Sequence, residues 1–192
     1  MWHVSIQLKA IQMKNVSLAG VLTFGLIIGA CSELPDSSAD TLGAMSVSEA
    51  KALIANGQNL ESIPKPTWRE LLTPEQYRVM WKNGTERAFS GSLLKNKTEG
   101  VYVTAGCRLP VFSSEHKFKS GTGWPSFYEM LNKENVVLKT DYSWGMKRVE
   151  VQSKCGEHLG HVFEDGPAPT GLRYCLNSAA LAFVPGVMQT KE

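Results

Sequence analysis

The sequence has little excess charge. Its 192 residues include 20 Lys and Arg against 18 Asp and Glu, a formal net charge of +2, and no dense basic cluster. A protein that follows a phosphate backbone needs such a cluster, so nucleic acid is not the expected partner. With 43% hydrophobic residues, 17 Gly and 9 Pro, the composition also excludes collagen-like, coiled-coil and wholly disordered proteins. The length fits one globular domain with additional chain at an end, and small molecules or peptides are the better candidate ligands.

Long helical segments are missing from the second half of the sequence. Short runs rich in β-forming residues are separated there by Gly, Pro, Asn and Asp. These runs are 101–104, 136–139, 147–152, 172–176 and 181–184. No helical period long enough for a crossover separates them, which argues against a parallel sheet. The sequence has no internal repeat, and it predicts a mainly β fold with an antiparallel core.

Helices are expected before this β-rich part. The segment from Ser46 to Ile63 carries apolar residues at helical spacing, with Gly57 as a stop signal. The sequence Thr73-Pro74-Glu75-Gln76 has the pattern of a capping box with proline at the first helical position. It predicts a second helix that runs through Lys82 and ends at Gly84.

The N-terminus has no charge for 18 residues between Lys14 and Glu33. An apolar stretch there ends in Ile28-Gly29-Ala30-Cys31, which resembles a bacterial lipobox. We therefore expect a signal peptide over residues 1–30, lipidation of Cys31, and a tether with an N-terminal helix over 31–66. An uncleaved anchor helix is the alternative. Either one places the domain outside the cytoplasm, in the cell envelope of a bacterium and attached to a membrane.

Cysteine is scarce, with four residues in the chain. If Cys31 is acylated, Cys107, Cys155 and Cys175 keep their thiols. An odd number of thiols in an oxidising compartment suggests one disulfide and one reactive cysteine.

The segment around Cys175 points to a reactive thiol. Read as a strand, residues 172–177 place Arg173, Cys175 and Asn177 on one face. The cation beside the thiol is expected to lower its pKa and raise the thiolate fraction. The alternative is that Cys175 is a small buried hydrophobic residue.

Two further motifs carry polar or aromatic groups. His158-Leu159-Gly160-His161 has a spacing that permits metal binding, acid–base work or a structural role. The loop from Ser120 to Phe127 is rich in glycine and contains Trp124-Pro125, so it can present an indole edge to a ligand. Alone, a tryptophan in such a loop is more often part of the core.

Taken in order, these motifs resemble the methionine-R-sulfoxide reductases of the B type over residues 68 to 185. The matching segments are Leu72-Thr73-Pro74-Glu75-Gln76-Tyr77, Gly84-Thr85-Glu86-Arg87, Phe89-Ser90-Gly91, Gly121-Thr122-Gly123-Trp124-Pro125-Ser126-Phe127, His158-Leu159-Gly160-His161-Val162-Phe163, Asp165-Gly166-Pro167 and Arg173-Tyr174-Cys175-Leu176-Asn177-Ser178. The resemblance implies two small antiparallel sheets, a catalytic domain over 67–187, and reduction of the R epimer of methionine sulfoxide in peptides and proteins.

The resemblance also implies roles for individual residues. Cys175 would be the nucleophile and would become a sulfenic acid that a thiol donor reduces. The groups expected around the substrate oxygen and the thiolate are His158, His161, Asp165 and Arg173, with Asn177 in support. Trp124 would receive the S-methyl group, and Phe163 is a further substrate-binding candidate. A sulfur-methyl group against an indole is a favourable contact.

The chain departs from this family at its other cysteines. Many relatives hold a structural zinc with two Cys-x-x-Cys pairs, whereas residues 104–107 and 153–155 retain one cysteine each, Cys107 and Cys155. A zinc site needs four ligands, so we expect no metal and no cofactor. Because cysteines that replace such a site should face each other, a structural disulfide between these two is expected. The usual resolving cysteine of the family is Thr122 here, which favours an external reductant, either a thioredoxin-like protein or a small thiol.

These expectations describe an enzyme that repairs oxidised envelope proteins. Two alternatives stay open at this stage. The first is a binding module that holds a metal or a partner on a related β fold. The second is a thiol hydrolase that uses Cys175 with His161, although no oxyanion-hole turn is evident in the sequence.

Overall fold

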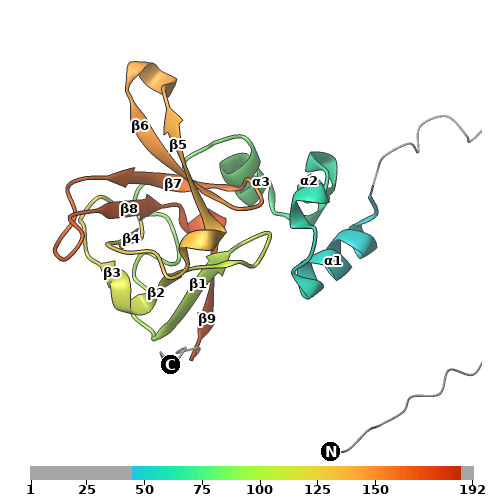
Figure 1. The fold of residues 1–192 in the computed structure, drawn as a ribbon, viewed down its shortest axis with the longest axis horizontal. Helices are drawn as coiled ribbons and strands as arrows, with labels where there is room; N and C mark the ends of the chain where they lie inside the picture. Colours follow the sequence, from blue (N-terminus) through green and yellow to red (C-terminus); the bar gives the residue numbers. More distant parts are fainter. Residues whose placement is uncertain (1–44, 187–192) are drawn as a thin grey trace, which may run out of the picture. The chain divides into compact units, whose positions relative to one another are not determined.

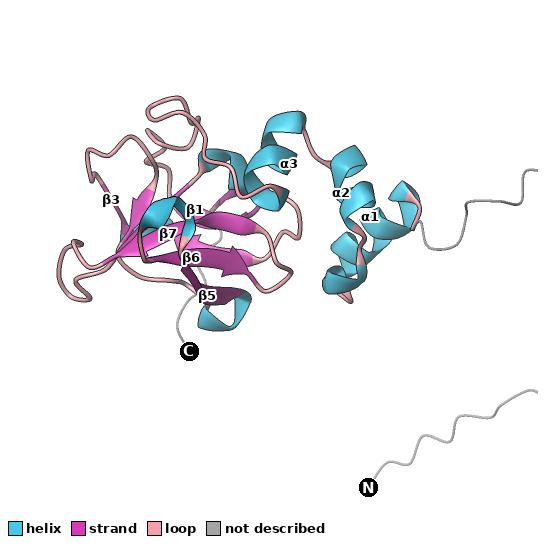
Figure 2. Ribbon diagram, turned by 90° about the horizontal axis from the view of Figure 1, so that it is seen from above, coloured by secondary structure: helices cyan, strands magenta, loops and turns pink. Residues whose placement is uncertain are grey.

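The computed structural model describes residues 45–186, which fold into two antiparallel sheets preceded by helices (Figures 1 and 2). The helices are α1 (Val47–Asn56), α2 (Lys65–Leu71) and α3 (Pro74–Trp81). The strands are β1 (Gly100–Thr104), β2 (Pro110–Ser113), β3 (Lys117–Phe118), β4 (Ser126–Phe127), β5 (Val136–Asp141), β6 (Arg148–Ser153), β7 (His158–Phe163), β8 (Arg173–Leu176) and β9 (Leu181–Pro185). The mainly β fold with N-terminal helices is confirmed.

The smaller sheet has three strands in the order β2-β1-β9, and the larger has six in the order β3-β4-β8-β7-β6-β5. Every strand pair is antiparallel. In Figure 1 the β5–β6 hairpin extends beyond the rest of the larger sheet. Strand β8, which carries Cys175, lies inside that sheet between β4 and β7.

An aromatic cluster joins the two sheets. The ring of Phe127 from β4 lies 4.9 Å from that of Tyr102 on β1 and 4.8 Å from that of Phe112 on β2, centroid to centroid. All three side chains are fully buried. Burial of large apolar side chains supplies most of the favourable free energy of such a core. The packed centre therefore provides a rigid support for β8.

The two helices expected from the sequence both form. In α1 the Ser46 hydroxyl accepts from Glu49 N–H, and the helix ends at Gly57 in a left-handed conformation (φ 63°). The helix is shorter than the expected 46–63, because the chain turns at Gly57 and continues as a 3-10 turn over Leu60–Ser62. In α3 the expected capping box of Thr73 and Gln76 is present.

Several elements were not anticipated from the sequence. Helix α2 has no side-chain cap hydrogen bond, so its start carries no capping signal in the sequence. Strands β3 and β4 are two residues long, which is too short for an alternating pattern. Strand β7 contains two histidines and a glycine, and it is defined by its pairing with β6 and β8. Long-range pairing decides such segments more than local propensity does.

The N-terminal expectations concern residues outside the described part of the chain. The signal peptide over 1–30, Cys31 and most of the tether all lie there. None of the helices between residues 45 and 186 is long and apolar enough to cross a membrane.

Candidate functional site

A cavity of about 190 Å³ opens beside Cys175 at the larger sheet. Its walls are formed by residues from β6, β7, β8 and three connecting segments, namely Thr85, Trp124, Arg148, Gly160, His161, Phe163, Cys175, Leu176 and Asn177. Among the described residues Cys175 is the free cysteine, and it is half-buried. A half-buried thiol in a cavity with an aromatic wall can contact a ligand about the size of one amino-acid side chain.

Strand register brings the thiol next to a histidine. Cys175 on β8 pairs with His161 on β7 and with Ser126 on β4. Directly paired residues of antiparallel strands project their side chains to the same face, about 5 Å apart. The alternation predicted for 172–177 also holds, since Tyr174 and Leu176 are buried in the core.

A bulge in β7 brings His158 to the side of His161. The register with β6 shifts between Val151 and Gln152, where two steps along β7 match one step along β6. Residues three apart in a regular strand point to opposite faces, and one extra residue reverses this. The two imidazole rings accordingly lie 5.4 Å apart in an edge-to-face arrangement.

Gly160 lies between the two histidines at a point where a side chain would not fit. A Cβ atom built there would be 2.1 Å from the carbonyl oxygen of Cys175 and 3.0 Å from the Cα of Leu176. Any other residue would therefore push β7 away from β8 and from the thiol.

His161 is held by a charged pair that sequence reasoning missed. Its Nε2 lies 2.9 Å from Oδ2 of Asp141, and the same oxygen accepts a 2.7 Å bond from Nη2 of Arg148. Asp141 and Arg148 are opposite each other on β5 and β6. The side chain and backbone N–H of Ser143, followed by His161, hold the pKa of Asp141 far below its ordinary value. This carboxylate therefore fixes the orientation of the His161 ring.

His158 occupies a different environment. It is 2% exposed, does not line the cavity, and its Nδ1 lies 2.5 Å from Oε1 of Glu150. Burial lowers the pKa of His158, and the hydrogen bond with Glu150 partly offsets this. His158 therefore supports His161 from behind and does not face a ligand in the cavity.

Arg173 lies beside the thiol and is fixed by two neighbours. Its Nε and Nη2 each donate a 2.8 Å bond to the carboxylate of Asp165, and its guanidinium lies 4.4 Å from the ring centroid of Phe163. Asp165 itself faces solvent and does not line the cavity. The carboxylate and the Phe163 ring thus hold the arginine in place beside the thiol.

The net effect on the thiol differs from the expectation. Burial raises the pKa of Cys175 above its ordinary value, while a hydrogen bond with Thr122 and the charge of Arg173 act in the opposite direction. The cation lowers the thiol pKa as expected, but loss of solvation is the larger effect. The hydroxyl oxygen of Thr122 lies 3.8 Å from the sulfur, so this position is in contact with the thiol.

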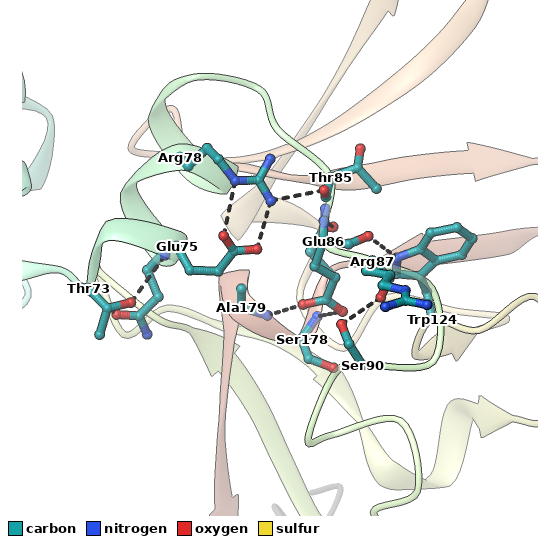
Figure 3. Close-up of polar contacts among 12 residues, drawn as sticks. Thr73, Glu75, Arg78, Thr85, Glu86, Arg87, Ser90, Trp124, Ser178 and Ala179 are labelled. Atoms are coloured by element: carbon teal, nitrogen blue, oxygen red, sulfur yellow. Dashed lines mark hydrogen bonds and ion pairs between the residues drawn. The ribbon is translucent and has the colours of Figure 1, made fainter.

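Glu86 connects several parts of the cavity wall (Figure 3). Its carboxylate accepts bonds from the backbone N–H of Ser178 at 2.7 Å and of Ala179 at 2.8 Å. Its own carbonyl accepts a 3.1 Å bond from the indole of Trp124, and its N–H donates to Oδ1 of Asn177 at 2.9 Å. The buried residue Glu86 therefore fixes the orientation of two wall residues, Trp124 and Asn177. Sequence reasoning gave Glu86 no role.

Cys107 and Cys155 form a disulfide with a Cα–Cα distance of 6.9 Å. The carboxylate of Glu157, which is fully buried, lies beside it and accepts bonds from the N–H groups of Gly106 and Cys107 and from the hydroxyl of Ser153. The two sulfurs and a Glu157 oxygen lie within 4.8 Å of one another, the only such three-residue group found between residues 45 and 186. These three atoms do not fit a structural zinc, because such a site uses four ligands and here both sulfurs are bonded to each other.

Of the residues proposed from the sequence, five line the cavity. They are Cys175, His161, Asn177, Trp124 and Phe163. Arg173 acts on the thiol from outside the cavity, whereas His158 and Asp165 each contact a residue that is closer to it. Thr85 and Arg148 are wall residues without a sequence-based prediction.

Comparison with known proteins gives one consistent family. Residues 72–185 match the family model described as the SelR domain. The chain is 60% identical over 117 residues to a "Peptide methionine sulfoxide reductase MsrB" of Methanosarcina barkeri, covering 60% of this chain and 82% of the relative. It is 56% identical over 117 residues to a protein of the same name from Leptospira interrogans, covering 60% and 89%.

A mouse protein is also similar. The chain is 51% identical over 118 residues to the "Methionine-R-sulfoxide reductase B3, mitochondrial" of Mus musculus, covering 61% of this chain and 47% of the mouse protein. The match to the SelR-domain model includes every wall residue of the cavity, since all of them lie between residues 72 and 185. The chain therefore belongs to the SelR-domain family, the MsrB family of peptide methionine sulfoxide reductases.

Proposed function

We propose that this protein reduces the R epimer of methionine sulfoxide in peptides and proteins to methionine. The observation that carries the proposal is the cavity, in which the Cys175 thiol faces an indole and an imidazole on the scaffold of the family. The soft thiolate suits attack on sulfur, and the indole of Trp124 suits an S-methyl group.

The proposed reaction transfers the sulfoxide oxygen to the cysteine. The Cys175 thiolate attacks the sulfoxide sulfur and forms a sulfur–sulfur bond while the oxygen takes up one proton. The resulting hydroxyl group then moves from the methionine sulfur to the cysteine sulfur as the sulfur–sulfur bond breaks. Methionine leaves reduced by two electrons, and Cys175 is oxidised by two electrons to a sulfenic acid. The oxygen departs only when protonated, so an acid must lie within hydrogen-bond reach.

His161 is the proposed acid. It lines the cavity, pairs in register with Cys175, and its Nε2 is held by Asp141, which also binds the wall residue Arg148. The hydrogen bond with Asp141 fixes the orientation of the ring. In this proposal His158 and Asp165 are positioning residues, for His161 and Arg173 respectively, and Asn177 supports the wall.

The proposed reductant is an external thiol, either a thioredoxin-like protein or a small thiol. Thr122 occupies the position beside Cys175 where a resolving cysteine would stand, and Cys107 and Cys155 are bonded to each other. The sulfenic acid would react with the donor thiol to give a mixed disulfide and water, and a second thiol would release the reduced enzyme.

We further propose that the protein is a lipid-anchored repair enzyme of the bacterial cell envelope. The lipobox-like sequence ending at Cys31 supports cleavage after residue 30, with a tether and helix over 31–66 ahead of the catalytic domain over 67–187. The Cys107–Cys155 pair is compatible with an oxidising compartment, where it would replace the family zinc as a structural link.

Chiral chromatography tests the proposed reaction. Purified protein with a dithiol reductant is incubated with a racemic peptide methionine sulfoxide, and the remaining substrate is separated by epimer. We expect the R epimer to disappear and the S epimer to remain, and we expect Cys175→Ser to abolish turnover. Consumption of the S epimer, or full activity of Cys175→Ser, contradicts the proposal.

A further inference from the structure

Phe89 is an exposed aromatic residue in an unfavourable backbone conformation. Its side chain is 68% exposed, and its φ of 67° lies in the left-handed region. This region is costly for bulky residues and is ordinarily taken by Gly or Asn. Exposure of a phenylalanine ring to water adds a second cost. Strained residues of this kind cluster at functional sites.

Contacts place Phe89 beside the loop that carries the wall residue Trp124. Its N–H donates a 2.8 Å bond to the carbonyl of Gly123, and a Cβ atom added to Gly123 would lie 3.1 Å from Cδ2 of the Phe89 ring. Gly123 directly precedes Trp124, a wall residue. The ring therefore lies over the start of the loop that presents the indole.

The segment 85–89, which carries Phe89, contacts the cavity wall at Thr85 and the Trp124 loop through Glu86 and Phe89. Thr85 lines the cavity, the carbonyl of Glu86 holds the indole of Trp124, and Phe89 binds Gly123. Figure 3 shows this segment beside Trp124. These two hydrogen bonds between the loops hold the backbone of Phe89 in its strained conformation.

The cavity accommodates one side chain, so the neighbours of that side chain in a polypeptide must lie outside it. An extended chain advances about 3.3 Å per residue. A residue next to the methionine sulfoxide therefore passes over the rim of the cavity. Methionine occurs mostly in apolar surroundings, and its neighbours are exposed when a damaged protein is partly unfolded.

We infer that the ring of Phe89 is a docking point for an apolar side chain adjacent to methionine sulfoxide in an extended polypeptide substrate. This inference rests on the proposed function and adds a substrate preference to it. The contact removes apolar area of both partners from water, which favours apolar neighbours over glycine. An aromatic ring loses little conformational entropy on binding because it has two side-chain torsions.

Two peptides test this inference. Both contain methionine-R-sulfoxide with blocked ends, one flanked by leucines and the other by glycines. We expect the wild-type protein to reduce the leucine peptide with a kcat/KM about fivefold higher, which is the size of a partly exposed apolar contact. The difference should lie in KM, since the contact exists before and during the reaction.

Variants of Phe89 separate the docking contact from the fold. Phe89→Asn removes the ring but suits the left-handed backbone, so its Tm should be equal to or above that of the wild type while the peptide ratio falls to about one. Phe89→Tyr keeps the ring and should keep the ratio. Leu131→Asn, which removes another exposed apolar side chain (37% exposed) that does not line the cavity, should also keep it.

The outcomes are distinct. Equal kcat/KM for the two peptides in the wild type, or a ratio that survives Phe89→Asn, overturns the inference and leaves the proposed function intact. A wild-type protein that reduces neither peptide overturns the proposed function itself.

Discussion

At the scale of single residues, the pKa of the Cys175 thiol is a balance between burial and its polar neighbours Thr122, Arg173 and Ser126. Burial raises the thiol pKa, and Thr122 and Arg173 lower it. Arg173 is the neighbour that carries charge, and its bidentate contact with Asp165 holds it in place. The thiolate fraction at neutral pH therefore depends on this arginine.

Replacement of Arg173 by glutamine should raise the Cys175 pKa further. Without the cation, the thiolate loses a favourable interaction and the buried thiol holds its proton to a higher pH. The rate of alkylation by iodoacetamide at pH 7 should fall about tenfold for each unit of increase, and the midpoint of its pH profile should move to higher pH. Arg87→Gln removes an exposed arginine and should leave the profile unchanged. A midpoint that stays in place for Arg173→Gln would show that the charge does not act on the thiol.

Thr122→Cys should convert the reductant route from external to internal. The Thr122 hydroxyl oxygen is 3.8 Å from the Cys175 sulfur, so a small movement would bring an introduced sulfur to bonding distance. After one equivalent of sulfoxide without reductant, the wild type should lose one titratable thiol and give a dimedone adduct at Cys175. The variant should lose two thiols and give no adduct. A crosslink from Cys175 to Cys107 or Cys155 in the wild type would contradict the external route.

At the scale of elements, α1 and α2 form a separate small core over the disulfide. Ala50, Leu60, Ile63 and Trp68 are buried together with both half-cystines. Trp68 stacks on Trp81 of α3 with a centroid distance of 5.6 Å. Cys107 is 2% exposed and Cys155 is 8% exposed. The helices therefore cover a disulfide in an enzyme whose proposed turnover requires thiol reductants.

Trp68→Ala should loosen the packing of α1 and α2 over the disulfide and make the disulfide more accessible to solvent. Truncation of a buried tryptophan costs about 3–5 kcal/mol of unfolding free energy because it leaves a cavity. The Cys107–Cys155 disulfide should then be reduced faster by low concentrations of dithiothreitol, as measured by thiol titration over time. Arg69→Ala changes an exposed residue on the same helix and should leave both quantities unchanged. A destabilised Trp68→Ala variant with the wild-type reduction rate would show that the helices do not shield the bond.

At the scale of the whole molecule, Glu157 links sheet and disulfide through a buried carboxylate. Burial raises its pKa, although bonds from Ser153, Cys107 and other neighbours oppose the shift. A carboxyl group whose pKa is higher in the folded state stabilises the fold most below its unfolded pKa of about 4.3. That contribution is lost as pH rises through the folded pKa, since the folded state must then bury a charge or keep the proton.

Glu157→Gln should remove this pH dependence. The unfolding free energy of the wild type, compared with that of the variant, should be highest near pH 4. As pH increases toward 8 this difference should fall by about 1.4 kcal/mol for each unit by which folding raises the pKa of Glu157. Urea unfolding of the oxidised proteins across this range measures the difference. Glu164→Gln alters an exposed carboxyl group and should follow the wild type. A wild-type stability that rises with pH relative to Glu157→Gln would contradict the direction of the shift.

Local motifs made much of the molecule predictable. The capping box at Thr73, the stop at Gly57 and the β-rich runs were readable because each depends on neighbouring residues. The alternation around Cys175 was readable because a strand has a fixed period of two. The family resemblance rests on the same short motifs, and the comparison over residues 72–185 confirms it.

Contacts between distant segments were beyond such reasoning. The sequence by itself predicted the fold class and pointed to Cys175 and the Trp124 loop as candidate site residues, because these predictions depend on residue type and short-range spacing. Only the tertiary structure decided that a bulge in β7 brings His158 to His161, that Asp141 binds both His161 and Arg148, and that burial outweighs Arg173 at the thiol. The physical reason is that strand register, desolvation and charge pairing depend on which remote segments meet, and local sequence does not encode these distances.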